Sequence, residues 1–185
     1  KRMNPAEMAA ILGQVSEARV TWEKLQALPA AAAKAFATTG LADLAMYEGR
    51  LADGEKILEP AVTAALSGQD KADAARWLVS LAYLRLKRGD TRQAIEDADR
   101  AVSLSTELGV TFLAGRAYLD AGRVPKVLEL ISALGSRLDD EPQIYAKLLE
   151  GEVAFKQGKT RDALQRFQEA QKIGDSWLGR YDLGR

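Results

Sequence analysis

The chain has 185 residues, of which 47% are hydrophobic and 28% are charged, and 26 basic residues balance 26 acidic ones. This composition is typical of a folded chain, and a net charge of zero argues against nucleic-acid binding, which needs a dominant positive surface. Cysteine and histidine are both absent. Without cysteine, the chain cannot form disulfides or thiolate metal sites, and without histidine it lacks the residue that most often serves as a general base or zinc ligand.

Helix-forming residues dominate the chain from end to end. Alanine, leucine and long charged side chains are abundant, and no stretch alternates apolar and polar residues for long enough to indicate a strand. Glycines and prolines divide the chain into segments of about 12 to 20 residues, the usual length of a globular helix. We expect helix caps at Ser16, Asp70, Thr91, Thr160 and Asp175, and first-turn prolines at Pro125 and Pro142. The sequence therefore predicts an all-α fold.

Five glycines with similar surroundings recur at intervals of 36, 40, 33 and 36 residues: Gly13, Gly49, Gly89, Gly122 and Gly158. A small residue precedes four of them by seven positions, at Ala42, Ala82, Gly115 and Gly151. Another small residue follows by five positions, at Ala18, Gly54, Ala94 and Ala163, with Val127 as the exception. A bulky apolar residue follows by nine positions, at Trp22, Leu58, Ile131 and Phe167, with Ala98 as the exception. Because antiparallel helices approach closely only where small side chains face each other, this period predicts stacked helix hairpins.

Two fragments carry the pattern most completely. LLEGEVAFKQGKTRDALQRFQEA contains Gly151, Gly158, Ala163, Phe167 and Ala170, and SLAYLRLKRGDTRQAIEDADRA contains Ala82, Gly89, Ala94 and Ala101. In these motifs the chain resembles the tetratricopeptide repeat (TPR) family over essentially its whole length. It departs from the family at the early tryptophan-type position, which holds Thr38, Leu78, Thr111 and Lys147. The resemblance implies a right-handed superhelical solenoid of antiparallel helix hairpins.

We expect residues 1–185 to form a single array. A degenerate or half repeat occupies 1–34, full repeats occupy 35–74, 75–107, 108–143 and 144–176, and residues 177–185 start a further, truncated repeat. The chain is thus expected to be a piece of a larger protein. The segment 175–185 carries Trp177, Leu178, Tyr181 and Leu183 without a second helix to cover them, which predicts end-to-end self-association.

The sequence contains no motif that indicates an enzyme, a cofactor-binding site or a metal site. The tightest acidic cluster, Asp139 to Glu141, precedes Pro142 and is interpreted as a solvated linker, and no phosphate-binding or calcium-binding motif occurs. The basic residues of the second full repeat, Arg85, Lys87, Arg88, Arg92 and Arg100, are offset by acidic residues within the same hairpin. We therefore expect a chain that is not an enzyme, with no cofactor, no nucleic-acid partner and no binding to a membrane surface.

The resemblance to TPR proteins implies a concave groove, lined by the first helices of successive repeats, in which a peptide or protein segment docks. The groove positions carried over from the family form four columns: Phe36, Arg76, Gly109 and Tyr145; Thr39, Val79, Phe112 and Leu148; Asp43, Tyr83, Arg116 and Glu152; and Met46, Leu86, Leu119 and Phe155. The fourth column is expected to pack between repeats. The predicted partner groove consists of Arg76, Val79, Tyr83, Phe112, Arg116, Tyr145, Leu148 and Glu152. The alternative for these residues is that they fill gaps between hairpins.

The predicted function is a protein–protein interaction scaffold, and the alternative is a structural or self-association segment with no peptide ligand. TPR proteins that bind the acidic C-termini of chaperones hold the terminal carboxylate with lysines, an arginine and asparagines. The corresponding groove positions here carry Thr39, Asp43, Ser80 and Arg76, so we do not expect a co-chaperone of this type. No stretch reaches the roughly 20 apolar residues that cross a bilayer, and no apolar signal core follows Lys1. The lack of cysteine fits both reducing and oxidising compartments, so the compartment stays open, with the cytoplasm favoured.

Overall fold

The computed structural model describes residues 14–184, apart from the side chains of Trp177, Leu178 and Tyr181. All of the regular structure in this range is helical, so the predicted all-α class is confirmed. The chain divides into two compact units, Lys1–Leu104 and Ser105–Arg185, named unit 1 and unit 2 below. Unit 1 contains α2 (Val15–Gln26), α3 (Ala31–Tyr47), α4 (Leu51–Ser67), α5 (Lys71–Arg88) and α6 (Thr91–Leu104). Unit 2 contains α7 (Leu108–Asp120), α8 (Val124–Gly135), α9 (Asp140–Lys156), α10 (Thr160–Ile173) and α11 (Trp177–Gly184).

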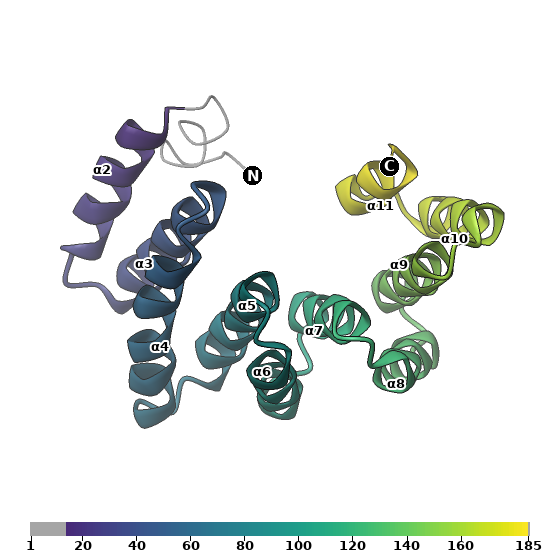
Figure 1. Ribbon diagram of the computed structural model, residues 1–185, viewed down its shortest axis with the longest axis horizontal. Helices are drawn as coiled ribbons and strands as arrows, with labels where there is room; N and C mark the ends of the chain where they lie inside the picture. Colours follow the sequence, from purple (N-terminus) through teal and green to yellow (C-terminus); the bar gives the residue numbers. More distant parts are fainter. Residues whose placement is uncertain (1–13, 185) are drawn as a thin grey trace. The chain divides into compact units, whose positions relative to one another are not determined.

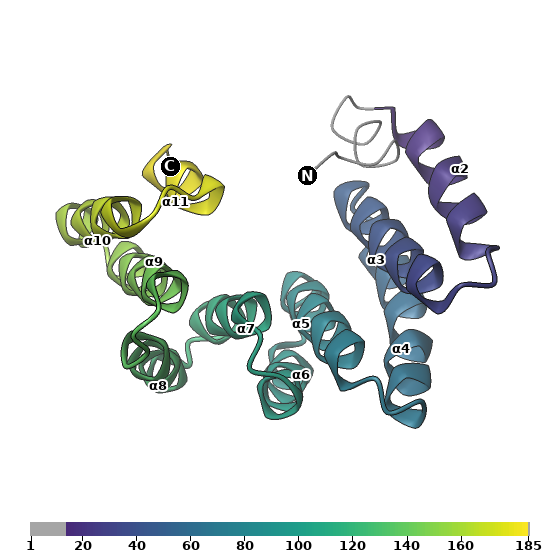
Figure 2. The same ribbon diagram turned by 180° about the vertical axis from the view of Figure 1, so that it is seen from behind.

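Consecutive helices pack as hairpins within each unit. In unit 1, α2 lies against α3, α3 against α4, and α5 against both α4 and α6 (Figure 1). In unit 2, α8 packs against α7 and α9, and α10 packs against α9 and α11 (Figure 2). The hairpins α3–α4, α5–α6, α7–α8 and α9–α10 each contain one of the recurrent glycines at their turn. The described chain is therefore a helical repeat.

These hairpin turns share one backbone conformation. Gly49, Gly89, Gly122 and Gly158 have φ angles of 72°, 87°, 72° and 74°. After each glycine, the next N–H donates to the carbonyl five residues earlier, as from Arg50 to Ala45 at 2.8 Å and from Lys159 to Ala154 at 2.9 Å. A left-handed residue at this point satisfies the last carbonyls of the first helix and reverses the chain. Gly13 lies outside the described residues.

The turn between α4 and α5 forms the same hydrogen bond with a residue other than glycine in the left-handed conformation. Gly68 has a φ of −81°, and the left-handed residue is Gln69, with a φ of 60°. The Asp70 N–H again donates to the carbonyl five residues earlier, that of Ala65, at 2.8 Å. A residue with a Cβ therefore holds a conformation that glycine adopts without steric cost.

The predicted helix caps are partly wrong. Asp70 Oδ1 accepts from the Asp73 N–H at 3.1 Å, as expected of a cap. For α6, however, the acceptor is the residue before Thr91, because Asp90 Oδ1 receives the Gln93 N–H. For α11 it is Ser176 rather than Asp175, since Ser176 Oγ receives the Gly179 N–H. Ser16 and Thr160 lie inside their helices, after Gln14 and Lys159, which make no side-chain cap. A cap must precede the first helical residue, so an error of one residue in a boundary moves the cap.

The hairpins interlock through the small and bulky residues of the repeat. Trp22, Leu58 and Phe167 are buried, and the small residues that repeat before the turn glycines are buried as well. A Cβ added at Gly151 would overlap the Phe167 ring, and one added at Gly40 would overlap the Trp22 ring. Glycine at these two positions thus lets an aromatic ring lie directly on the helix backbone.

None of the helices within residues 14–184 is long and apolar enough to cross a membrane.

Candidate partner-binding surface

The predicted groove residues of unit 1 lie on α5. Arg76 is exposed, and its guanidinium donates to Asp73 at 2.8 Å. Tyr83 is 46% exposed, and the Lys87 ammonium lies 5.1 Å from the centroid of its ring. Val79, between them, is buried. One face of α5 thus presents an arginine and a tyrosine that a partner could reach.

The predicted groove residues of unit 2 contact one another across α7 and α9. The Phe112 and Tyr145 rings are tilted with centroids 5.3 Å apart, and the Arg116 guanidinium lies 5.9 Å from the Phe112 centroid. Arg116 Nε also lies 3.4 Å from Oε1 of Glu152, which is buried. Burial of the Tyr145 hydroxyl raises its pKa above the ordinary value. In the free chain these four side chains therefore stabilise the α7–α9 contact.

Three of the four residues in the second predicted column pack inside the units, whereas Thr39 is exposed. Val79, Phe112 and Leu148 have exposed fractions of 3%, 2% and 0%, so a partner could reach them only if the helices repacked. They face the neighbouring helix because a first helix must cover the next hairpin along one of its stripes. The expectation that these three residues line an open groove is therefore corrected: they form core. Arg76, Tyr83 and, in part, Arg116 and Tyr145 keep accessible surface.

The third column lies as the repeat register predicts. In unit 1, Asp43 of α3 and Tyr83 of α5 border one hollow, and in unit 2, Arg116 of α7 and Glu152 of α9 form an ion pair. Equivalent positions on neighbouring first helices thus border the same hollow in unit 1 and bind each other in unit 2.

The hollow in unit 1 has a volume of about 520 Å³ and is lined by Asp43, Met46, Tyr47, Leu51, Tyr83 and Lys87. Its wall is largely apolar and aromatic. Tyr47 is 71% exposed. Phe36, which lies earlier on α3 and does not line the hollow, is 45% exposed and packs edge-on against Trp22 with ring centroids 5.0 Å apart. Concave apolar surface with a few polar groups is the usual character of a binding site.

A single carboxylate and a single ammonium lie among the residues that line this hollow. Asp43 keeps exposed surface, yet burial of its carboxyl raises its pKa from 3.8 to about 6. Burial disfavours the charged form of a carboxyl group when no cation compensates for it. The Lys87 ammonium lies over the Tyr83 ring instead. The Asp43 carboxylate forms no hydrogen bond or ion pair with any residue in the described range.

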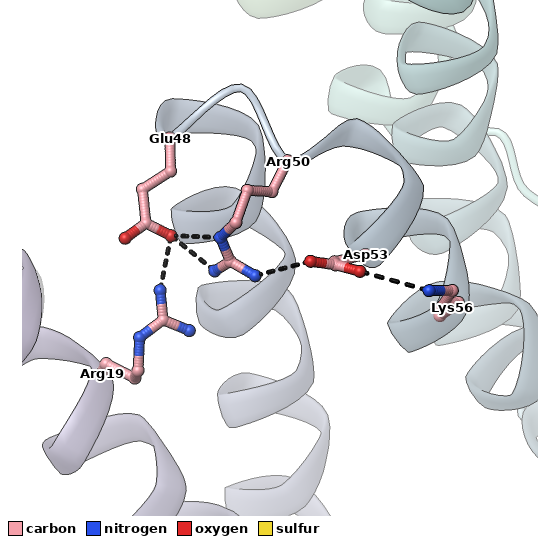
Figure 3. A network of polar contacts seen from close by, with 5 residues as sticks. All are labelled: Arg19, Glu48, Arg50, Asp53 and Lys56. Carbon is pink, nitrogen blue, oxygen red and sulfur yellow. Dashed lines mark hydrogen bonds and ion pairs between the residues drawn. The ribbon is translucent and has the colours of Figure 1, made fainter.

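A polar network fixes the turn that supplies part of this wall. Glu48 Oε2 accepts from Arg19 of α2 at 2.5 Å and from Arg50 Nε at 2.9 Å, and Arg50 Nη1 donates to Asp53 at 2.9 Å (Figure 3). Lys56 completes the chain of contacts at 3.4 Å from Asp53. Tyr47 and Leu51 flank this turn in sequence. The network therefore holds α2, α3 and the start of α4 in the arrangement that borders the hollow.

Sequence reasoning missed Tyr47, Leu51 and Lys87 as lining residues. Each lies within two residues of a recurrent turn glycine, Gly49 or Gly89. The predicted columns end at Met46 on α3 and Leu86 on α5, one residue before Tyr47 and Lys87, and they do not include the second helices, to which Leu51 belongs. An exposed aromatic residue beside a turn was the signal that could have indicated the hollow.

The predicted self-association segment is only partly described. Residues Trp177–Gly184 form α11, in which Asp182 is buried, but the side chains of Trp177, Leu178 and Tyr181 and all of Arg185 lie outside the described residues. End-to-end association stays a prediction. Within the described range, no three aspartate or glutamate residues gather as a metal site would require.

Several solved structures resemble this arrangement. A Podosopora anserina putative kinesin light chain with nearly identical TPR-like repeats aligns with a TM-score of 0.67 at 18% identity, over 91% of this chain and 90% of that one. MamA aligns with a TM-score of 0.56 at 20% identity, over 94% of this chain and 96% of that one. The chain has a TPR-like fold.

A third TPR-like structure is YrrB, described as a TPR protein with an unusual peptide-binding site. It aligns with a TM-score of 0.52 at 16% identity, over 97% of this chain and 89% of that one. At these sequence identities, the similarity to the three structures concerns the fold alone. No protein-family model and no curated protein matches the chain.

Proposed function

We propose that the chain is a protein-interaction module whose unit 1 binds a peptide or a segment of a partner protein along α3 and α5. The observation that carries this proposal is the set of exposed aromatic residues on α3 and α5: Tyr47 and Tyr83 line a preformed hollow and are 71% and 46% exposed, and Phe36, earlier on α3, is 45% exposed. Aromatic side chains supply much of the binding energy at interfaces, and exposed apolar surface gathered in one place is a mark of an interaction site.

Three further facts support binding rather than chemistry. The sequence has neither histidine nor cysteine, the groups that most enzymes use as bases and nucleophiles. The titratable groups of the hollow are one carboxylate, one ammonium and two phenols, with no paired acid and base within it. Among structures with the same fold, YrrB is described as having a peptide-binding site.

The test is selection of peptides from a random library on the immobilised full chain. We expect selected peptides to bind at least tenfold more weakly to the Tyr47→Ala/Tyr83→Ala variant, because each exposed aromatic anchor contributes on the order of 1–2 kcal/mol. Melting temperature should change little, since Tyr47 is 71% exposed and Tyr83 46%.

The matched control is Leu138→Ala, which removes a side chain that is 94% exposed between α8 and α9. It should leave peptide affinity unchanged. A library that yields no binder, or binders that ignore the double alanine variant, would overturn the proposal and favour a structural role.

A further inference from the structure

The hollow in unit 1 contains one negative charge that the fold leaves uncompensated. The other carboxylates near the α3–α4 turn are neutralised: Glu48 by Arg19 and Arg50, and Asp53 by Arg50 and Lys56. No described residue pairs with Asp43. A carboxylate that is partly desolvated and unpaired gains free energy when a cation enters beside it.

The walls around Asp43 suit an organic cation. Tyr47 and Tyr83 supply two aromatic rings, and Met46 and Leu51 supply apolar surface that can cover a methylene stem. Aromatic faces attract ammonium and guanidinium groups, and the Tyr83 ring already carries the Lys87 ammonium at 5.1 Å. A carboxylate beside aromatic rings matches an arginine or lysine side chain, whose stem packs on apolar surface while its head pairs with the acid.

We infer that this hollow is a subsite for a cationic side chain, arginine or lysine, of the bound partner segment. The inference rests on the proposed function and names the chemistry of its ligand: a segment with a basic residue flanked by apolar ones. The basic residue pairs with Asp43 and lies between the two tyrosine rings. Lys87 is the one cation among the lining residues, and its charge opposes the entry of a second cation.

The direct test uses a small probe and needs no peptide. Nα-acetylarginine amide is titrated into the full chain while the ring protons of Tyr47 and Tyr83 are followed by NMR, with Nα-acetylnorleucine amide as the neutral probe. We expect saturable shifts of both rings with the arginine probe, and weaker, unsaturated shifts with the neutral one. Equal responses to the two probes would overturn the inference.

Three charge variants sharpen the result. Asp43→Asn should weaken binding of the arginine probe about tenfold, since it removes a charge-assisted pair. Lys87→Gln should strengthen binding, because it removes the opposing charge. Glu129→Gln removes an exposed carboxylate on α8, outside the hollow, and should have no effect. Should Glu129→Gln weaken binding as much as Asp43→Asn, the attraction would be a property of the net charge and the subsite would be refuted.

Acidity provides an independent readout. Since the pKa of Asp43 is about 6 in the free chain, arginine-probe binding should be strong at about pH 7.5 and weak at about pH 5. Lys87 is the only other charged residue that lines the hollow. Binding to Asp43→Asn should lack this dependence, and a wild-type profile without a change between these two pH values would contradict the inference.

Failure of the subsite and failure of the proposed function give different results. If the library selects neutral or acidic peptides that the tyrosine variant releases, the interaction module stands and the cationic subsite falls. If the arginine probe binds through Asp43 while the library yields nothing, the subsite stands and peptide binding falls. The supporting outcome is enrichment of arginine or lysine on wild type that Asp43→Asn abolishes.

Discussion

At the scale of single residues, the same third column serves two purposes. In unit 2 its members form an ion pair, Arg116 with the buried Glu152, whereas in unit 1 Asp43 and Tyr83 line one hollow and Asp43 has no cationic partner among the described residues. The repeat register predicted that these residues occupy equivalent positions on neighbouring first helices, because the register depends only on the repeat length. It could not predict whether two meeting side chains bind each other or a ligand, because that depends on their charges and on how deeply they are buried.

Reversal of the charge at Arg116 should destabilise unit 2. Arg116→Glu places a second carboxylate beside Glu152, which is 6% exposed, so we expect a loss on the order of 2 kcal/mol in the free energy of unfolding. Arg92→Glu is the matched control, since Arg92 pairs with Glu96 on the surface of α6 at 3.1 Å and is largely exposed. It should cost only a few tenths of a kcal/mol. Urea unfolding of both variants tests the difference, and equal losses would contradict it.

Asp43 should make the protein more stable in mild acid. Its pKa is about 6 in the folded chain against an ordinary value of 3.8, so the folded chain binds this proton more tightly than the unfolded chain does. The stability that this group contributes is complete below about pH 3.8 and is lost as the pH rises through about 6. Asp43→Asn should therefore melt at a higher temperature than wild type at about pH 7.5 and at the same temperature near pH 4. A constant difference across this range would show that burial of the charge is not the cause.

At the scale of the helices, glycine has two different roles. At the hairpin turns it supplies a positive φ, and inside helices it makes room for a neighbouring side chain. The repeat period predicted that glycines divide the helices and that small residues lie where helices face each other, but it did not predict the φ angles. It did not reveal Gln69, because nothing in the local pattern indicates that the residue after Gly68 takes the left-handed conformation.

Gln69→Gly should stabilise unit 1. Gln69 has a φ of 60°, which costs a residue with a Cβ roughly 1 kcal/mol relative to glycine, although glycine also loses more entropy on folding. We expect a net gain of about 0.5 kcal/mol. The reverse change at an equivalent turn, Gly89→Gln, should cost about 1 kcal/mol, because Gly89 has a φ of 87°. Thermal unfolding distinguishes the two, and a loss of stability in Gln69→Gly would contradict the strain.

Helix glycines offer a sharper contrast. Gly151→Ala should destabilise the protein by about 1–3 kcal/mol, because the new Cβ would overlap the Phe167 ring. Gly109→Ala, in the first turn of α7, meets no atom within 4 Å and should stabilise the protein by up to about 0.5–1 kcal/mol through helix propensity. Opposite signs are expected from one chemical change. If both variants lose stability equally, close packing of α9 on α10 is not what Gly151 provides.

At the scale of the whole molecule, the sequence predicted the architecture better than the binding surface. Turn glycines, small positions and bulky positions repeat because every hairpin solves the same packing problem, so five approximate copies strengthen one another. A binding surface has no such repetition. Val79, Phe112 and Leu148 were expected in an open groove but are buried, because a repeat period does not distinguish a stripe that covers the next hairpin from a stripe that faces a partner.

The division into two compact units predicts that damage to one core stays within its unit. Gly40→Ala pushes on Trp22 in unit 1, and Gly151→Ala pushes on Phe167 in unit 2, so the two variants create the same kind of overlap in different cores. In repeat proteins stability is a sum of repeat and nearest-neighbour contributions, and opening is local. Hydrogen exchange should therefore show that Gly40→Ala lowers amide protection mainly within residues 14–104, and that Gly151→Ala lowers it mainly within residues 105–184. Protection lost evenly across both ranges in either variant would instead show that the chain unfolds as one cooperative body.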